Sequence, residues 1–166
     1  MRGVLSLLKH NRFVLEQGPF GPLLNKQINV DHSENPNDPE LLKLQALFAP
    51  SAITSTSPSD LNVCAEAYAQ LRHAFALPFF KRRSWLDAKV AVYVWPGLIS
   101  EGFVNLLDER KPETLVLLAY YCVLLKYVNS CWFFKGIGVA LLRAIEEELS
   151  EEWRPWIEWA IEQPVS

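Results

Sequence analysis

The side chains best suited to chemistry lie within the most apolar segment of the sequence. Residues 112–128, PETLVLLAYYCVLLKYV, carry Tyr120, Tyr121 and Lys126 among side chains that are almost all apolar. A few polar groups in an apolar wall are the usual form of a small-molecule pocket, where they orient the bound molecule. These three residues are therefore the candidate catalytic groups if the protein is an enzyme.

Aromatic residues around the same segment could form the wall of such a pocket. The candidate ligand-binding residues are Trp95, Phe103, Tyr120, Tyr121, Trp132, Phe133 and Trp156. The simpler interpretation places these side chains in the core, with each hydroxyl or indole N–H donating to a backbone carbonyl. In the same way, Lys126 at the end of the apolar run would extend its amine to solvent rather than act in a site. The sequence leaves both interpretations open.

Common catalytic and cofactor-binding motifs are missing from the sequence. It contains no GxGxxG, P-loop, GxSxG or HExxH pattern, and no cluster of histidines and carboxylates with metal-ligand spacing. We therefore expect neither a metal nor a cofactor. Gly136 and Gly138 lie in a helical pattern with no preceding strand, so close packing of helices explains them better than a dinucleotide site. His73 lies on the polar face of a predicted helix and is expected at the surface.

Composition and charge indicate one globular domain without general affinity for nucleic acid. The 166 residues, 50% of them apolar, fit a single domain over 1–166. The formal net charge is −3, and the one basic run, 81–83, is short and typical of a solvated loop. No apolar run approaches the roughly 20 residues that span a bilayer, so we expect no membrane span.

The cysteines indicate a reducing compartment. Cys64, Cys122 and Cys131 are odd in number, form no CxxC pair and lie in apolar surroundings, where free cysteine behaves as a small hydrophobic residue. Neither a zinc site nor a disulfide framework is expected. The N-terminus also has no signal-peptide pattern, so we expect an intracellular protein, cytoplasmic or nuclear.

The elements that must position these residues are predicted to be helices. Apolar residues recur every three or four positions over 60–77 and again over 132–149, which predicts two amphipathic helices. The segment 112–128 is apolar all round, so its helix is expected to be buried at the centre of the fold. Near the C-terminus, Ser150 and Pro155 begin a short helix. It carries Trp153, Trp156 and Trp159 at spacings of three, hence on one side.

Shorter signals mark the remaining helix ends. Asp38-Pro39-Glu40 has the order of an N-cap, a proline at the first position and an early acid. The segment 86–95 is compatible with a helix or a strand, and Trp95-Pro96-Gly97 is expected to end it in either case. Ser100 can cap a further short helix. The pattern predicts an all-α domain of about six to eight helices around the central helix.

A series of residues within 60–160 follows a recognisable order. They are Trp95-Pro96, Phe103, Leu106, Leu107, Arg110, Pro112-Glu113-Thr114-Leu115, Leu117-Leu118-Ala119-Tyr120-Tyr121, Val123-Leu124-Leu125, Trp132, Gly136, Gly138, Leu141, Leu142, Ile145, Glu152-Trp153, Pro155-Trp156 and Trp159. In this order they resemble the C-terminal regulatory domain of fungal zinc-cluster transcription factors, including sterol-responsive regulators and regulators of secondary-metabolite clusters. The N-terminal residues 1–50 match poorly and are expected to form additional helices.

The resemblance implies an α-helical domain with a hydrophobic pocket, which binds ergosterol and controls activation in the sterol-responsive regulators. The family commonly has histidine at the position of Tyr120 and proline at the position of Ala160. Its six-cysteine DNA-binding cluster is absent from this sequence, so no direct binding of nucleic acid is expected.

Three functions are compatible with these observations. The first is binding of an apolar small molecule, a sterol, terpenoid or polyketide, by a ligand-sensing domain. The second is a free-standing enzyme of secondary metabolism, which Met1 and the short chain favour. It would be a cofactor-independent cyclase or isomerase, for example a pericyclic one, because orientation of a reactive substrate alone lowers a barrier by several kcal/mol. The third is a dimerisation module whose tryptophan-rich tail forms the interface of a homodimer.

Overall fold

The part of the chain that the structure describes is built from helices. The computed structural model describes Ser6 and residues 31–49, 56–79 and 88–166. The seven α-helices in these ranges are α3 (Asp38–Lys43), α4 (Pro58–Ala76), α5 (Ala88–Leu98), α6 (Glu101–Asp108), α7 (Pro112–Tyr127), α8 (Ile137–Glu148) and α9 (Arg154–Glu162). The 3-10 helices are η1 (His32–Glu34), η2 (Leu44–Phe48), η3 (Leu77–Phe79) and η4 (Glu151–Trp153). With no strand in these ranges, the predicted all-α class is confirmed.

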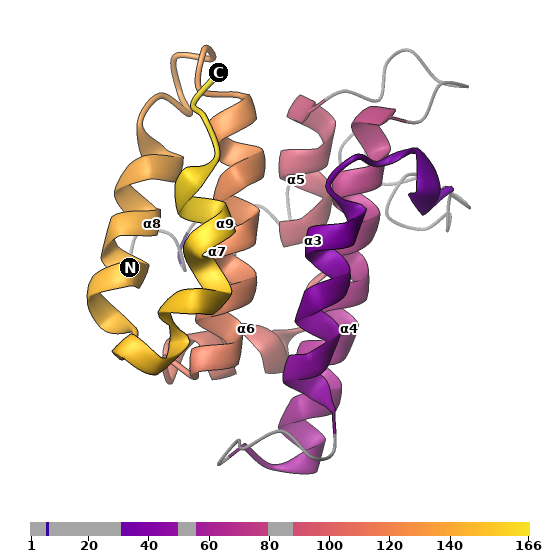
Figure 1. Ribbon diagram of the computed structural model, residues 1–166, viewed down its shortest axis with the longest axis vertical. Coiled ribbons are helices and arrows are strands. Elements are labelled where there is room, and N and C mark those ends of the chain that lie inside the picture. The colour runs from indigo at the N-terminus through magenta and orange to yellow at the C-terminus, as the bar shows by residue number, and fades with distance from the viewer. Residues whose placement is uncertain (1–5, 7–30, 50–55, 80–87) are drawn as a thin grey trace.

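Helix α7 is the buried centre of the arrangement, as predicted for 112–128. Pro112 begins it, where the N–H that proline lacks would have no helical partner, and every residue from Glu113 to Lys126 is buried. The pair α8 and α9 covers one side of α7, while α4 and α5 cover another (Figure 1). A helix without a polar face is stable in water because its neighbours bury it in this way.

Serine side chains cap two of the helices, and the sequence predicted one of these caps. Ser57 accepts a hydrogen bond from the Asp60 N–H at 3.2 Å at the start of α4, and Ser100 accepts one from the Phe103 N–H at 3.2 Å at the start of α6. The predicted cap at Ser100 is therefore confirmed. The basic run 81–83 and most of the helices expected over 1–50 lie outside the described residues.

The segment 86–95 is helical as far as it is described, and its helix ends one residue after the expected stop at Trp95-Pro96-Gly97. Helix α5 ends at Leu98, so Pro96 lies inside its last turn and does not end it. Because proline has no N–H to donate, the carbonyl of Val92, four residues earlier, lacks its usual helical partner. The hydroxyl of Tyr121 on α7 donates to that carbonyl at 2.7 Å instead. A side chain from another helix thus stabilises the proline inside α5.

The amphipathic helix expected over 132–149 begins only at Ile137. The preceding residues form turns, in which Gly136 has a φ of 78°, a conformation that glycine adopts without strain. Asn129 Oδ1 accepts a hydrogen bond from the Gly136 N–H at 2.7 Å. These turn contacts replace the expected first helical turn, so Trp132 lies outside the helix.

Asp38 does not act as the predicted N-cap. Asn37 occupies the N-cap position of α3, and the Asp38 carboxylate accepts hydrogen bonds from Arg72 on α4. Arg72 Nε lies 2.6 Å from Asp38 Oδ1, and Nη2 lies 2.7 Å from Oδ2. A bidentate, partly buried pair of this kind fixes the geometry of the helices it joins, and here it holds α3 against α4.

Gly138 allows the closest approach of α8 to α7. A Cβ atom at this position would lie 2.9 Å from the Cys122 carbonyl oxygen, 3.0 Å from Leu125 Cβ and 3.1 Å from the Lys126 nitrogen. Two of these neighbours are backbone atoms of a buried helix and have little freedom to move. Close helix packing is therefore confirmed as the reason for glycine at position 138. It is wrong for Gly136, where an added Cβ would contact nothing within 4 Å and the positive φ is the reason for glycine.

We expect Gly138→Ala to lower the free energy of unfolding by roughly 1–3 kcal/mol, the usual cost of overpacking a core. Urea denaturation measures this change. Gly102→Ala on α6 is the matched control, because its Cβ would lie 3.6 Å from Val63, an ordinary contact. Alanine is the better helix former by about 1 kcal/mol, so the control should be neutral or stabilising. Equal effects of the two substitutions would refute the packing argument.

Candidate functional site

The structure distributes the predicted site residues over four places. Trp95, Phe103 and Tyr121 form a buried cluster, named the Trp95 cluster here. Trp132 and Phe133 lie on the turn between α7 and α8. Tyr120 and Trp156 line a groove beside α9. Lys126 lines a separate hollow between α7, α8 and the C-terminal segment.

The aromatic rings of the Trp95 cluster are packed against one another in the core. Trp95 and Phe103 are 0% exposed, and their ring centroids lie 5.7 Å apart in an edge-to-face arrangement. The Tyr121 ring lies 4.8 Å from that of Trp95. The Trp95 indole N–H donates to the Ala67 carbonyl at 2.9 Å, and the Tyr121 hydroxyl donates to the Val92 carbonyl. Both polar tips are thus bonded to backbone, as the core interpretation expects.

Burial also limits the chemistry of Tyr121. It raises the pKa of the phenol well above its ordinary value, and nearby Cys122 and Tyr93 act in the same direction. The hydroxyl therefore stays protonated at neutral pH and serves as a hydrogen-bond donor to α5. This arrangement gives Tyr121 a role in holding the fold.

Trp132 and Phe133 are exposed on the turn before α8. Trp132 is 85% exposed and Phe133 46%. Their rings meet edge to face, with centroids 5.4 Å apart. The Phe133 ring centroid lies 4.7 Å from that of Phe134, and the Phe134 centroid lies 5.7 Å from that of Tyr93 on α5. These aromatic side chains therefore form a surface row that is separate from the Trp95 cluster.

Helices α3, α7 and α9 border a groove of about 570 Å³, named the α9 groove here. Its lining residues are Glu40, Lys43, Tyr120, Pro155, Trp156, Glu158, Trp159 and Glu162. Tyr120 is 3% exposed and stacks on Trp159, with ring centroids 5.0 Å apart and planes at 25°. Burial raises the pKa of the Tyr120 phenol, and Glu40 raises it further, so the hydroxyl is neutral at physiological pH.

The sequence of α9 explains which of its residues face the groove. Pro155 stands in the first turn, where its missing N–H is tolerated. Ile157 and Ala160 are fully buried against the core. Trp156 and Trp159 lie beside this buried face and reach the groove, whereas Trp153 belongs to the preceding η4 and is not part of the lining. Of the three tryptophans predicted on one side of this helix, two therefore line the groove.

Several groove residues were absent from the predicted site. Trp159 could have been inferred from its spacing to Trp156, and Glu158 and Glu162 from their spacing of four beside the tryptophans. Glu40 and Lys43 carried no such signal. They line the groove together with residues of α7 and α9, which are distant from α3 in the sequence.

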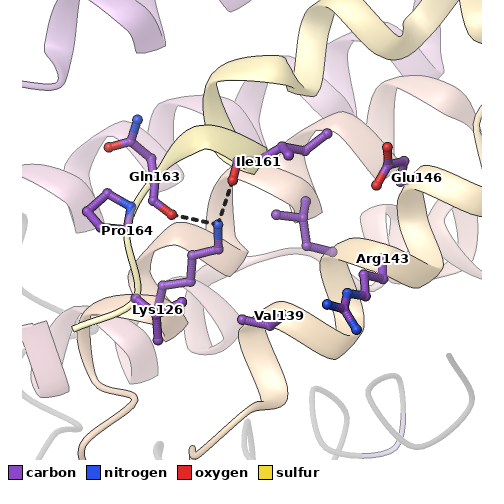
Figure 2. Close-up of a pocket in the computed structure, with 9 residues that line it drawn as sticks. Lys126, Val139, Arg143, Glu146, Ile161, Gln163 and Pro164 are labelled. Atoms are coloured by element: carbon purple, nitrogen blue, oxygen red, sulfur yellow. Dashed lines mark hydrogen bonds between the residues drawn. The ribbon is translucent and has the colours of Figure 1, made fainter.

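Lys126 lies in a second hollow of about 360 Å³, shown in Figure 2. Its Nζ donates to the carbonyl oxygens of Ala160 at 2.9 Å, Ile161 at 3.2 Å and Gln163 at 2.9 Å. The residue is 4% exposed, so the expectation that it extends to solvent is wrong. An amine at the C-terminus of a helix satisfies carbonyls that have no helical partner, and this requirement draws Lys126 inward.

The Lys126 amine is committed to this capping role. Burial lowers its pKa, whereas Cys122 and the three carbonyl oxygens favour the protonated form. The Lys126 carbonyl also accepts a hydrogen bond from the Ser166 N–H at 3.1 Å. Side chain and backbone of one residue thus fasten the C-terminal segment to α7.

Other groups that could do chemistry are buried or scattered. Among the described residues, no group of three or more His, Cys, Asp or Glu side chains could hold a metal ion. Cys64 and Cys122 are free and buried, and burial raises the pKa of the Cys64 thiol to about 12. His73 was expected at the surface but is half-buried. Burial lowers the pKa of its imidazole, and the nearby His32 lowers it further.

Within the described ranges, no single helix has both the length and the apolar character to cross a membrane. Helices α5 and α6 reach that length and apolar character only when they are taken together, and the chain bends by 89° between them.

Comparison with known proteins gives one distant similarity. No protein-family model matches the chain, and no solved structure matches it. A Zn(2)-C6 fungal-type transcription factor from Gibberella zeae is 27% identical over 108 residues. That alignment spans 63% of this chain and 21% of the transcription factor. The chain is therefore similar to part of a fungal transcription factor.

Proposed function

We propose that the chain is a helical ligand-binding domain related to the regulatory part of a fungal zinc-cluster transcription factor. In this proposal it binds an apolar small molecule, such as a sterol, terpenoid or polyketide, in the α9 groove. The observation that carries the proposal is the combination of three aromatic residues, Tyr120, Trp156 and Trp159, in a hollow of about 570 Å³. Small-molecule sites usually have volumes of about 300–1,000 Å³ and aromatic side chains in their walls. The charged side chains of this groove lie beside its aromatic rings.

The distribution of the predicted ligand-binding residues supports the groove over the Trp95 cluster. Trp95 and Tyr121 have both of their polar tips bonded to backbone carbonyls. Tyr120 and Trp156, in contrast, line a hollow that is open to solvent. The similarity to a transcription factor supports a sensor over an unrelated carrier. An intracellular location, cytoplasmic or nuclear, goes with this proposal.

The enzymatic alternative uses the same groove. Tyr120 is the candidate catalytic group that lines it. With a raised pKa, its phenol would act as a hydrogen-bond donor that orients a reactive substrate, which suits a cyclase or isomerase without a cofactor. Conversion of the bound molecule on incubation would establish this alternative.

Native mass spectrometry and organic extraction of the purified chain test whether an apolar molecule is retained. Titration of the tryptophan fluorescence with that molecule, or with ergosterol if none is retained, then gives the affinity. We expect Trp156→Ala to weaken binding by about thirtyfold, because truncation of a central aromatic contact costs about 2 kcal/mol.

Trp132→Ala is the matched control, since it removes an exposed indole outside the groove. It should leave the affinity unchanged. Thermal melts of both variants show whether the Trp156 variant is folded at the temperature of the titration. Equal affinity of the two variants would exclude the α9 groove as the binding site. A stable dimer without any bound apolar molecule would favour the dimerisation module instead.

A further inference from the structure

The α9 groove has an excess of negative charge beside its aromatic rings. On α3, the carboxylate oxygens of Glu40 lie 2.8 Å and 2.7 Å from Lys43 Nζ, so these two charges neutralise each other. On α9, Glu158 and Glu162 lie one helical turn apart on the same rim. No residue that the structure describes forms an ion pair with either of them. Two like charges at this spacing are unfavourable for a helix by a few tenths of a kcal/mol.

The hydroxyl of a largely buried tyrosine lies at the same place. Only 3% of the Tyr120 surface is exposed, and the residue lines the groove. Its hydroxyl forms no hydrogen bond with any described residue, whereas the neighbouring Tyr121 hydroxyl donates to the Val92 carbonyl at 2.7 Å. The hydroxyl oxygen itself is not among the fully buried side-chain atoms that lack a partner, so it faces the open space of the groove. The Tyr120 hydroxyl is therefore available to a molecule that enters the groove.

We propose that the ligand of the α9 groove is an organic cation, with a protonated amine attached to an apolar body. The inference rests on the proposed function and narrows it: among molecules with an apolar body, it selects those that also carry a protonated amine. The apolar body lies against Trp156 and Trp159. The amine lies between the carboxylates of Glu158 and Glu162 and donates one N–H to the Tyr120 hydroxyl oxygen.

The physical argument is one of complementarity. An ammonium group neutralises the unpaired carboxylates and is attracted to the face of an indole ring. A neutral molecule of the same shape would gain only the aromatic contact. A carboxylate in the same position would be repelled by Glu158 and Glu162. The rim thus selects ligands by the sign of their charge.

Three probes with the same ten-carbon tail test the inference with the intact chain: decylamine, decanol and decanoate, each titrated below its micelle concentration by calorimetry. We expect decylamine to bind about tenfold more tightly than decanol, and decanoate to bind most weakly. Added salt should weaken decylamine binding and leave decanol binding unchanged, because it screens exposed charges.

The double substitution Glu158→Gln with Glu162→Gln should remove the preference for decylamine while preserving the affinity for decanol. The matched control is Glu147→Gln with Glu151→Gln, which changes the net charge equally at two exposed residues outside the lining. It should keep the preference. Tyr120→Phe should weaken decylamine binding severalfold but leave decyltrimethylammonium unaffected, because that cation has no N–H to donate.

Each outcome decides between the two proposals. Equal binding of the three probes would overturn the inference about charge and leave ligand binding in the groove intact. Loss of the decylamine preference in both double variants would also overturn it, since the effect would then come from net charge alone. If no probe binds, the proposed function fails, and the inference fails with it.

Discussion

Replacing Trp95 by alanine is expected to lower the free energy of unfolding by about 3–5 kcal/mol, the range measured for tryptophan-to-alanine changes in cores. Trp95 is fully buried and contacts the rings of Phe103 and Tyr121. The substitution removes these contacts and leaves the Ala67 carbonyl without the indole N–H that it accepts at 2.9 Å. For a chain of this size, the melting temperature should fall by roughly 6–20 °C.

Trp95→Phe separates the ring from its hydrogen bond. It keeps an aromatic side chain of smaller size, so we expect a loss of about 1–2 kcal/mol. Urea denaturation of both variants measures the two values, and the milder variant keeps the prediction testable if Trp95→Ala does not fold. A variant that is as stable as the unchanged protein but no longer binds an apolar ligand would contradict the core role. Trp95 would then line a binding site, as its first interpretation from sequence allowed.

Replacing Lys126 by methionine is expected to lower the free energy of unfolding by about 3 kcal/mol, because hydrogen bonds to a charged group contribute about 1.5–3 kcal/mol each and these three share one amine. Methionine has a similar length and flexibility, so the apolar part of the side chain is retained. The carbonyl oxygens of Ala160, Ile161 and Gln163 would lose their partner at the end of α9. The C-terminal segment should then exchange its amide hydrogens faster, which hydrogen-exchange mass spectrometry measures.

Lys135→Met is the control for this substitution. It removes an exposed lysine from the turn before α8 and should change the stability by less than about 0.5 kcal/mol. If Lys126→Met instead abolished conversion of a bound substrate while leaving stability and exchange unchanged, Lys126 would be a catalytic group rather than a helix cap. Comparable small effects of the two variants would show that the three carbonyl contacts contribute little.

Local patterns in the sequence predicted the helices well because helix formation depends on neighbours three and four residues apart. The cap at Ser100 and the proline at the start of α7 could be predicted for the same reason. The errors occurred where a distant contact changed the local preference. Pro96 remains inside α5 because Tyr121 of α7 satisfies the carbonyl it leaves free.

The candidate site was predictable only in part. Tyr120 and Trp156 were inferred as ligand-binding residues, and the structure places both in one groove. Trp132 and Phe133 carried the same aromatic signal but lie on an exposed turn. Residue type alone cannot separate these cases, because a tryptophan in the core, in a groove or on a turn looks the same in a sequence.

Local sequence patterns were enough to predict the all-α class, the buried central helix and the glycine at the closest helix contact. Each of these depends on local spacing or on the absence of a side chain. The packing of the helices was needed to show that Tyr121 and Lys126 hold helices together, and that Glu40 and Glu158 border one groove. These roles depend on which groups meet after α3, α7 and α9 pack, and a buried polar atom bonds to whatever partner that packing brings within reach.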